Sequence, residues 1–344
     1  MTLHSEILEQ PVRIAELLHS QRQQIEAAAE VIRSRSPRYV FLAARGTSDN
    51  AGRYANYLWG AFNQLPLALA TPSLFTYYKK PPILKDGLVV GISQSGKSPD
   101  VVSVLREGRS QGCLTLAITN NSNSELAASA DLVLDIKAGS ENAVAATKTY
   151  TTELMTIAML SAALNKDEEA WQTLAQVPQW MTQMLQHDAE IARLAERFRY
   201  MKECVVLGRG FNYATAFEWA LKLKELTYVV AEPYSSADFE HGPIAMVEGG
   251  FPVLAVAPSG QVFDSMLSML DRLRRQHAVE LVVISNEKAA LSLAQSPIQL
   301  AQMPEWVSPM VSIVAGQLFA SHLTRIMGYN AEAPRTIIKV TETL

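Results

Sequence analysis

An internal repeat constrains the fold of this chain more than any other feature of its sequence. Three pairs of landmarks, each shortly after an apolar run, recur at a nearly constant distance: Arg45-Gly46 and Arg209-Gly210 (209 − 45 = 164), Ser95-Gly96 and Ser259-Gly260 (259 − 95 = 164), and Asn120 and Asn286 (286 − 120 = 166). A spacing this regular predicts that one structural unit occurs twice.

Each copy alternates short apolar strands with helical segments. In the first copy we expect strands at 39–44, 88–90, 114–118 and 132–136. The strand at 132–136 has a weaker counterpart in the second copy, at 298–300. Parallel strands joined by crossover helices need helices on both faces of the sheet. The sequence therefore predicts an α/β fold with two tandem domains, each a parallel sheet flanked by helices in a flavodoxin-like α/β/α sandwich.

The length agrees with two domains, because 344 residues exceed what one hydrophobic core usually serves. Charged, helical stretches without strand signals lie before and between the copies. We therefore expect four parts: a helical leader at 1–35, a first domain at 36–166, a helical connector at 167–199, and a second domain with a C-terminal tail at 200–344.

The composition excludes several classes of protein. With 48% hydrophobic and 19% charged residues, the chain is typical of a globular protein. No apolar run has transmembrane length and no signal peptide precedes the leader, so we expect a cytoplasmic protein without a membrane partner. The net charge is −4 and the sequence has no basic stripe, which argues against nucleic-acid binding. Cys113 and Cys204 are expected to be reduced core thiols.

Three loops at expected strand ends are rich in hydroxyl groups: Thr47-Ser48, 93–98 and 145–149. Ligands of open parallel sheets bind at such ends, where helix N-termini offer N–H groups to anions. Helix capping is the alternative, since a Ser or Thr at a strand–helix junction is often an N-cap. Three such loops at one edge favour a phosphate or polyol site. In the second copy Pro258 removes a donor, so we expect phosphate at 93–98 and none at Ser259.

Two nucleotide-binding motifs fit the sequence poorly. The segment 91–100 lacks the GxxxxGK[ST] pattern of a P-loop. The segment 208–214 loosely matches the dinucleotide fingerprint, but no strand-end acidic residue stands about 20 positions further on. We therefore expect neither a mononucleotide nor NAD.

Catalytic candidates lie on an expected helix of the second copy, at 217–226. Glu218, Lys222 and Glu225 stand at positions i, i+4 and i+7 and so share one face. A solvated ladder of ion pairs is the alternative interpretation of such a pattern.

His241 follows in a segment without helical or strand periodicity, directly before Gly242-Pro243. It is a candidate for a general acid and base, with a turn residue as the alternative. Asp238, Glu240 and His241 match no standard zinc spacing, so no metal site is expected there. The other histidines are expected to be surface or packing residues: His4, His19, His187, His277 and His322.

A wider set of motifs points to one family. They are Gly-Thr-Ser at 46–48, Ser-Gln-Ser-Gly at 93–96, Val-Ala-Ala-Thr-Lys at 144–148, Leu-Lys-Leu-Lys-Glu at 221–225, His-Gly-Pro at 241–243, and the tail 334–342. Together they resemble the sugar isomerase (SIS) proteins, and in particular the isomerase half of glucosamine-6-phosphate synthase, over essentially the whole chain. The resemblance implies that both domains are SIS domains.

The resemblance also implies a phosphosugar ligand and neither a metal nor a cofactor. It assigns the 6-phosphate to Ser93, Gln94, Ser95 and Ser98, and the sugar to Gly46, Thr47, Ser48, Val144 and Ala146.

Four catalytic roles follow from the same resemblance. Glu225 would move a proton between C1 and C2, and His241 would open the sugar ring. Lys222 would assist at the sugar oxygens, and Lys339 would meet the open-chain carbonyl. In the family the histidine comes from a neighbouring subunit, which implies a homodimer with shared active sites.

Some features depart from the synthase. Neither Cys113 nor Cys204 stands where its glutaminase nucleophile must, and Met1-Thr2 leads straight into the leader, so glutamine-dependent amination is not expected. Lys97 stands where the synthase usually has an acidic residue, and Glu240 stands where it usually has a basic one. These changes leave the identity of the substrate open.

Stand-alone proteins of this kind resemble deaminases that convert glucosamine 6-phosphate to fructose 6-phosphate and ammonia, which is the function we expect. The alternatives are a fructoselysine-type 6-phosphate deglycase, a galactosamine-type deaminase/isomerase and an isomerase-only relative of the synthase. A non-catalytic phosphosugar-binding regulator is the alternative from another class. The residues before Pro37 are too few and not basic enough for a fused DNA-binding domain, which favours an enzyme.

Overall fold

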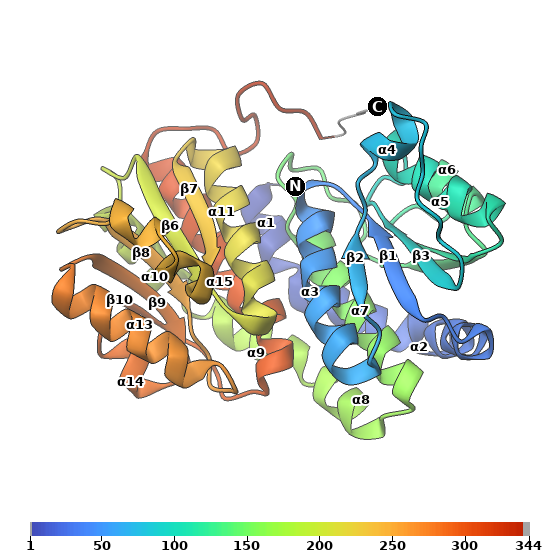
Figure 1. Ribbon diagram of the computed structural model, residues 1–344. Helices are drawn as coiled ribbons and strands as arrows, with labels where there is room; N and C mark the ends of the chain where they lie inside the picture. The colour runs from blue at the N-terminus through green and yellow to red at the C-terminus, as the bar shows by residue number, and fades with distance from the viewer. Residues whose placement is uncertain (1, 340–344) are drawn as a thin grey trace. The chain divides into compact units, whose positions relative to one another are not determined.

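A computed structural model describes residues 2–339 of the chain and divides them into two compact units. The first-sheet unit contains residues 9–142, 146–178 and the described residues from 338 onward. The second-sheet unit contains residues 2–8, 143–145 and 179–337. Figure 1 labels the elements of both units.

The elements of the first-sheet unit are α2 (Gln10–Arg35), β1 (Tyr39–Ala43), α3 (Gly46–Asn63), β2 (Leu67–Leu69), α4 (Ser73–Thr76), β3 (Gly87–Ile92), α5 (Pro99–Ser110), β4 (Leu114–Thr119), α6 (Glu125–Ala128), β5 (Leu132–Asp135), α7 (Lys148–Asn165) and α8 (Glu168–Leu174). The helix α9 (Val177–Leu185) follows, and the chain passes to the other unit within it.

The elements of the second-sheet unit are α1 (Leu3–Leu8), α10 (Asp188–Arg197), β6 (Glu203–Gly208), η1 (Gly210–Asn212), α11 (Tyr213–Thr227), β7 (Val230–Ser235), α12 (Ser236–Glu240), η2 (Pro243–Met246), β8 (Pro252–Val256), α13 (Phe263–Gln276), β9 (Glu280–Ser285), α14 (Lys288–Leu291), β10 (Ser296–Gln299), η3 (Glu305–Val307) and α15 (Ser308–Ile326).

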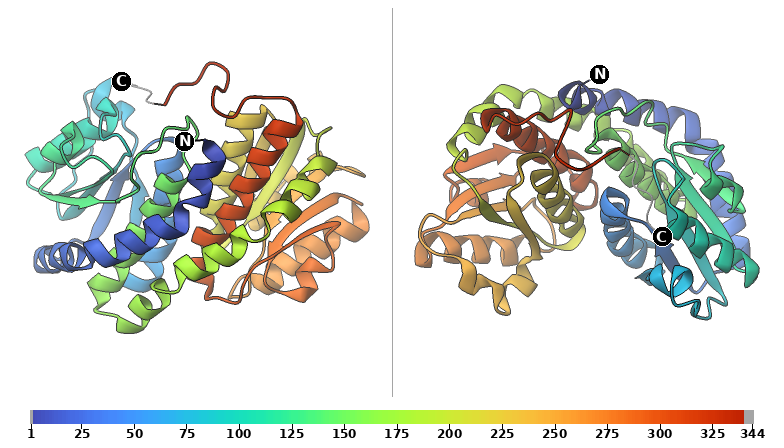
Figure 2. Two further views of the ribbon diagram at one scale, coloured as in Figure 1. Left: turned by 180° about the vertical axis from the view of Figure 1, so that it is seen from behind. Right: turned by 90° about the horizontal axis from the view of Figure 1, so that it is seen from above.

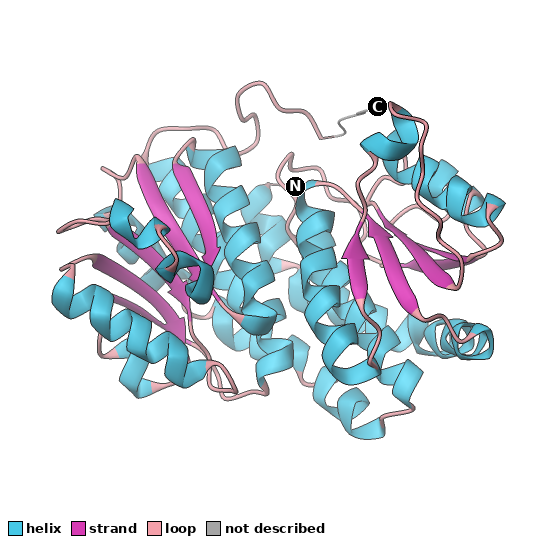
Figure 3. Ribbon diagram, in the orientation of Figure 1, coloured by secondary structure: helices cyan, strands magenta, loops and turns pink. Residues whose placement is uncertain are grey.

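Both sheets are parallel and have the same strand order. The order is β2-β1-β3-β4-β5 in one and β10-β9-β8-β6-β7 in the other, which is the same sequence of strands read from the opposite edge. It is the order of flavodoxin-like folds. Helices flank the strands of each unit (Figure 3). The expected fold class, two tandem parallel α/β sandwiches, is confirmed.

Each sheet has five strands, one more than the sequence indicated. The additional strands, β2 and β7, are edge strands. β2 has three residues, and β7 contains Glu232 and Pro233, which lie in the segment before His241 whose sequence shows no strand periodicity. An edge strand needs hydrogen bonds along one side only and therefore tolerates proline and charge.

The two faces of each sheet are covered by different helices. In the first-sheet unit, α5 packs Leu105 into a cluster that contains Val89 of β3, while α7 packs against α2 and α3. In the second-sheet unit, α13 packs Leu270 against Val253 of β8, while α15 packs against α10 and α11. These paired layers bury the apolar runs that the sequence shows.

Both cysteines are buried and free, as expected. Burial raises the pKa of the Cys204 thiol, so it stays protonated near neutral pH. Among the described residues, no helix combines the length and apolar character that a membrane span requires.

Candidate functional site

The loop after β3 is held in shape by its own hydroxyl groups. The Gly96 N–H donates to Oγ of Ser93 at 3.2 Å, and the hydroxyls of Ser93 and Ser98 lie 3.4 Å apart. Gly96 has φ +64°, and a Cβ on it would lie 2.1 Å from Oγ of Ser124. Only glycine therefore fits this position.

The N-cap side chains of the helices that follow these loops make no capping hydrogen bond. The N-cap residues of α3, α5 and α7 are Arg45, Ser98 and Thr147, and none of the three side chains caps its helix. By contrast, Ser124 does cap α6 by accepting the N–H of Ala127. Side-chain capping by Ser98 and Thr147 is therefore absent, and anion binding at these loops stays a prediction.

The loop after β1 lies beside the loop after β3, since the two strands are neighbours. Gly46 has φ +52° and starts α3, which puts Thr47 and Ser48 in its first turn. Buried Ser48 donates from Oγ to Oε1 of Glu153 at 2.8 Å. An ion pair of 2.5 Å joins Arg45 to Asp100 at the start of α5, so the two loops are fixed to each other.

Glu141 organises a third segment, between β5 and α7. Its buried carboxylate accepts the N–H groups of Thr147 and Thr149 at 2.8 and 3.1 Å, and pairs with Nζ of Lys339 at 2.8 Å. Burial acts to raise the pKa of Glu141, but Lys339 and these hydrogen bonds outweigh it, so the pKa is lowered. Lys339 is thus held by a carboxylate that the sequence did not single out. The tail positions 340–342 lie outside the described residues.

The helix α11 carries a buried charge cluster of the second-sheet unit. Nζ of Lys222 lies 2.6 Å from Oε2 of Glu225 and 3.3 Å from Oε1 of Glu218. The side chains of Lys222 and Glu218 are fully buried, whereas that of Glu225 is 25% exposed. The alternative of a solvated ladder is therefore wrong, because the helix turns this face inward.

The charge state of Lys222 follows from its neighbours. Burial acts to lower its pKa, but the carboxylates of Glu218 and Glu225 more than offset burial, so the pKa is raised. The lysine is therefore a fixed cation beside a partly accessible carboxylate.

His241 is the C-cap residue that follows α12 and is exposed, and the neighbouring Glu240 pairs with Arg272 at 2.6 Å. Within residues 2–339, the one group with the composition of a metal site is His4, Asp188 and His322, which does not include His241. The expectation that His4 and His322 are plain surface or packing residues was incomplete, because both contact Asp188.

The other residues that were predicted to contact the sugar or its phosphate belong to different units. Val144 belongs to the second-sheet unit and Ala146 to the first-sheet unit. Gln94 lines an open polar cavity of about 840 Å³ in the first-sheet unit, together with Asn120 and Lys137. The other predicted ligand residues do not line this cavity.

The counterpart loop of the second sheet is closed by a side chain. Oε2 of Glu305 accepts the N–H of Gln261 at 2.7 Å, and a Cβ on Gly260 would lie 2.0 Å from the same oxygen. Ser259 donates its N–H to Asn286. A carboxylate of the protein itself thus already accepts the backbone N–H of Gln261 in this loop.

These features define a class of protein: a duplicated flavodoxin-like α/β protein with a hydroxyl-rich loop at the strand ends of its first sheet. The sequence profile of the SIS domain matches residues 35–163 and 198–327. The chain belongs to the SIS family.

Similar proteins include the glutamine–fructose-6-phosphate aminotransferase (isomerizing) of Thermococcus kodakarensis, at 33% identity over 97% of this chain and 56% of the relative. The chain thus spans about half the length of the curated relatives it matches. The solved C-terminal domain of the aminotransferase from Francisella tularensis has a TM-score of 0.89 and 28% identity, covering 96% of this chain and 98% of that one.

A second similar structure is the glucosamine-6-phosphate deaminase of Thermotoga maritima. It has a TM-score of 0.73 and 20% identity, and the match covers 96% of this chain and all of that one (100%). At this identity the likeness concerns the fold.

Proposed function

We propose that the chain is a phosphosugar aldose–ketose isomerase that releases ammonia, converting glucosamine 6-phosphate to fructose 6-phosphate. The observation that carries the proposal is the pair on α11, in which a partly exposed carboxylate, Glu225, lies 2.6 Å from a buried cation, Lys222. Membership of the SIS family and the hydroxyl-lined loop at 93–98 support it.

Substrate binding would begin at the phosphate. Ser93, Gln94, Ser95 and Ser98 would hold the 6-phosphate with hydroxyl, amide and backbone N–H groups, as the absence of side-chain capping by Ser98 favours. Thr47, Ser48, Val144 and Ala146 would contact the sugar.

The reaction would need only proton transfers. Glu225 would take the C2 proton of the open-chain aldose, which gives an enolamine, and a proton would return to C1. The resulting C2 imine would add water and lose ammonia, which leaves the ketone of fructose 6-phosphate. No metal or cofactor is required for these steps.

The other residues would assist around this proton transfer. Lys222, held as a cation, would stabilise negative charge that develops on a sugar oxygen, and Lys339 would meet the open-chain carbonyl. Exposed His241 would open the ring, and we propose that it does so in a homodimer with shared active sites.

The test is incubation of the pure protein with glucosamine 6-phosphate and with glycated amino-acid 6-phosphates. We expect ammonia and fructose 6-phosphate from the first substrate only. Release of a free amino acid from the second, without ammonia from the first, would replace the proposal with a deglycase. Binding of the sugar phosphates without turnover of either would indicate a regulator.

A further inference from the structure

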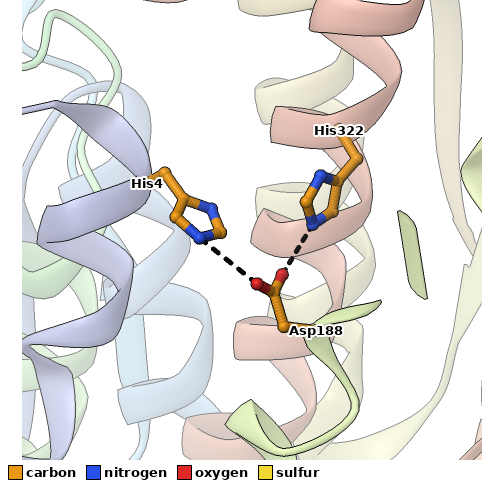
Figure 4. A group of neighbouring side chains, drawn as sticks. All are labelled: His4, Asp188 and His322. Carbon is orange, nitrogen blue, oxygen red and sulfur yellow. Dashed lines mark hydrogen bonds and ion pairs between the residues drawn. The ribbon is translucent and has the colours of Figure 1, made fainter. Parts of the chain in front are cut away.

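Three side chains from three helices meet at one point of the second-sheet unit (Figure 4). They are His4 of α1, Asp188 at the start of α10, and His322 of α15. Nε2 of His4 lies 3.2 Å from Oδ2 of Asp188, and Nε2 of His322 lies 2.6 Å from Oδ1. We call this group the His4–Asp188–His322 clamp.

The composition of the clamp would suit a divalent transition metal, but its surroundings do not. Nη2 of Arg325 lies 2.7 Å from Nδ1 of His322. A guanidinium can only donate, so Nδ1 must accept and Nε2 carries the proton that it donates to Asp188. A metal ligand would need the opposite arrangement, with Nε2 free and Nδ1 donating. The clamp is therefore held by hydrogen bonds.

The clamp holds the short helix α1 against α15, and Figure 2 shows the two helices side by side. Leu3 and Ile7 are buried there, at 1% and 0% exposure. The Leu3 N–H also donates to Oε1 of Glu332 at 2.9 Å. A six-residue helix has little stability of its own, so these contacts determine where α1 lies.

A buried carboxylate connects α1 to a proposed sugar contact. Glu6 is fully buried, and its Oε2 accepts the N–H of Ala143 at 3.2 Å. Ala143 immediately precedes Val144, and the segment 143–145 belongs to the same unit as α1. A buried carboxylate is costly unless it accepts hydrogen bonds, so this contact favours one position of the segment.

We propose that α1 positions the segment 143–145 for the sugar, with Glu6 as the positioning residue and the His4–Asp188–His322 clamp as its anchor. The inference rests on the proposed function of Val144 as a sugar contact. Neither Glu6 nor the clamp takes part in the chemistry, so their loss should weaken binding of the substrate more than its conversion.

The first experiment compares Glu6→Leu with Glu6→Gln. Leucine removes the acceptor at similar size, whereas the glutamine amide oxygen can still accept the Ala143 N–H. For Glu6→Leu we expect the KM for glucosamine 6-phosphate to rise about threefold to tenfold with little change in kcat, as for one lost hydrogen bond. The KM of Glu6→Gln should be close to that of the wild type. Equal KM values in the wild type and in Glu6→Leu would overturn the proposal.

The second experiment asks whether the clamp acts through Glu6, by a double-mutant cycle. Asp188→Ala should raise the KM in the wild-type background and leave it unchanged in the Glu6→Leu background. The matched control is His187→Ala, which breaks the exposed pair with Glu190 at the same end of α10. Additive effects of Asp188→Ala and Glu6→Leu, or a lower Tm for Asp188→Ala without any KM effect, would show a merely structural clamp.

Two further measurements test the inference independently of the proposed function. Hydrogen exchange of the 143–145 amides should be faster in Glu6→Leu and Asp188→Ala than in the wild type and His187→Ala, even if the wild type releases no ammonia. Unchanged exchange in both variants would contradict the inference alone. A Tm of the wild type that falls in EDTA and recovers with Zn²⁺ would contradict the hydrogen-bonded clamp.

Discussion

At the scale of single residues, the proposed chemistry depends on the different burial of three neighbouring charges. Lys222 and Glu218 are withdrawn from solvent, and of the two carboxylates beside the lysine only Glu225 is partly exposed, at 25%. A buried cation must be paired to be tolerated, and it in turn fixes the carboxylate beside it. Glu225 is therefore both anchored and accessible, as a general base must be.

Glu225→Gln removes the base and keeps the shape. We expect kcat to fall by at least about a hundredfold, the usual scale of general acid–base catalysis, while the Kd for fructose 6-phosphate stays near that of the wild type. Glu232→Gln, an exposed acid on β7, is the matched control and should behave as the wild type. Turnover that survives in Glu225→Gln would assign the base to another group.

Lys222→Met tests the buried ion pairs through stability. The variant leaves Glu218 and Glu225 without the cation that lies between them, so the free energy of unfolding in urea should fall by about 3–5 kcal/mol. Lys224→Met changes an exposed lysine of the same helix and should alter it by no more than about 0.5 kcal/mol. Equal stability of the two variants would contradict the account of the cluster.

The lowered pKa of Glu141 predicts that the folded chain loses stability in acid. Its pKa is lowered in the folded chain from an ordinary value of 4.5, so its contribution is complete above that pH and is lost as the pH falls through the lower folded value. Denaturant unfolding between about pH 5 and pH 2 should therefore show a steeper loss in the wild type than in Glu141→Gln. Parallel curves would mean that Lys339 does not hold the carboxylate in solution.

At the scale of elements, the repeat has produced two loops with different surroundings. The loop of the first sheet ends at Ser98, whose side chain does not cap α5, whereas the loop of the second sheet is closed by Glu305. The two loops also differ in backbone conformation, since φ is +64° at Gly96 and +149° at Gly260. The chain offers a matched pair of serines for comparison, Ser95 and Ser259.

Ser95→Ala should raise the KM for the phosphosugar by roughly tenfold or more, the cost of a hydrogen bond to a charged group. Ser259→Ala should leave it unchanged, because Glu305 already accepts the backbone N–H of Gln261 in the loop that contains Ser259. Steady-state kinetics of the two variants gives the comparison. A phosphate bound at Ser259 in a structure with substrate would contradict this assignment.

At the scale of the whole molecule, the repeat predicted two parallel sheets, because continuous apolar strands that alternate with helices can be arranged in few ways. The edge strands β2 and β7 could not be predicted in this way. β2 has only three residues and β7 contains Pro233, so neither gives a clear strand pattern in the sequence. The division of the chain was also hidden, because α1 and the segment 143–145 join the second-sheet unit through contacts far apart in sequence.

The candidate site was predictable where residues form local motifs and not where they meet by folding. The hydroxyl-rich loops and the Lys222 face of α11 were visible as motifs. Glu141, Glu153 and Glu305 were not, because an isolated glutamate in a loop or helix shows nothing of its partners. The 164-residue spacing from Glu141 to Glu305 (305 − 141) was the one available signal.

The most direct test of the central claim follows the proton at C2. Glucosamine 6-phosphate deuterated at C2 is incubated with the wild type and with Glu225→Gln, and the C1 and C2 positions are monitored by NMR. The account predicts that the wild type removes the C2 deuterium while fructose 6-phosphate and ammonia form, and that Glu225→Gln leaves it in place. Retention of deuterium at C2 by a wild-type protein that binds the sugar phosphate would contradict the account.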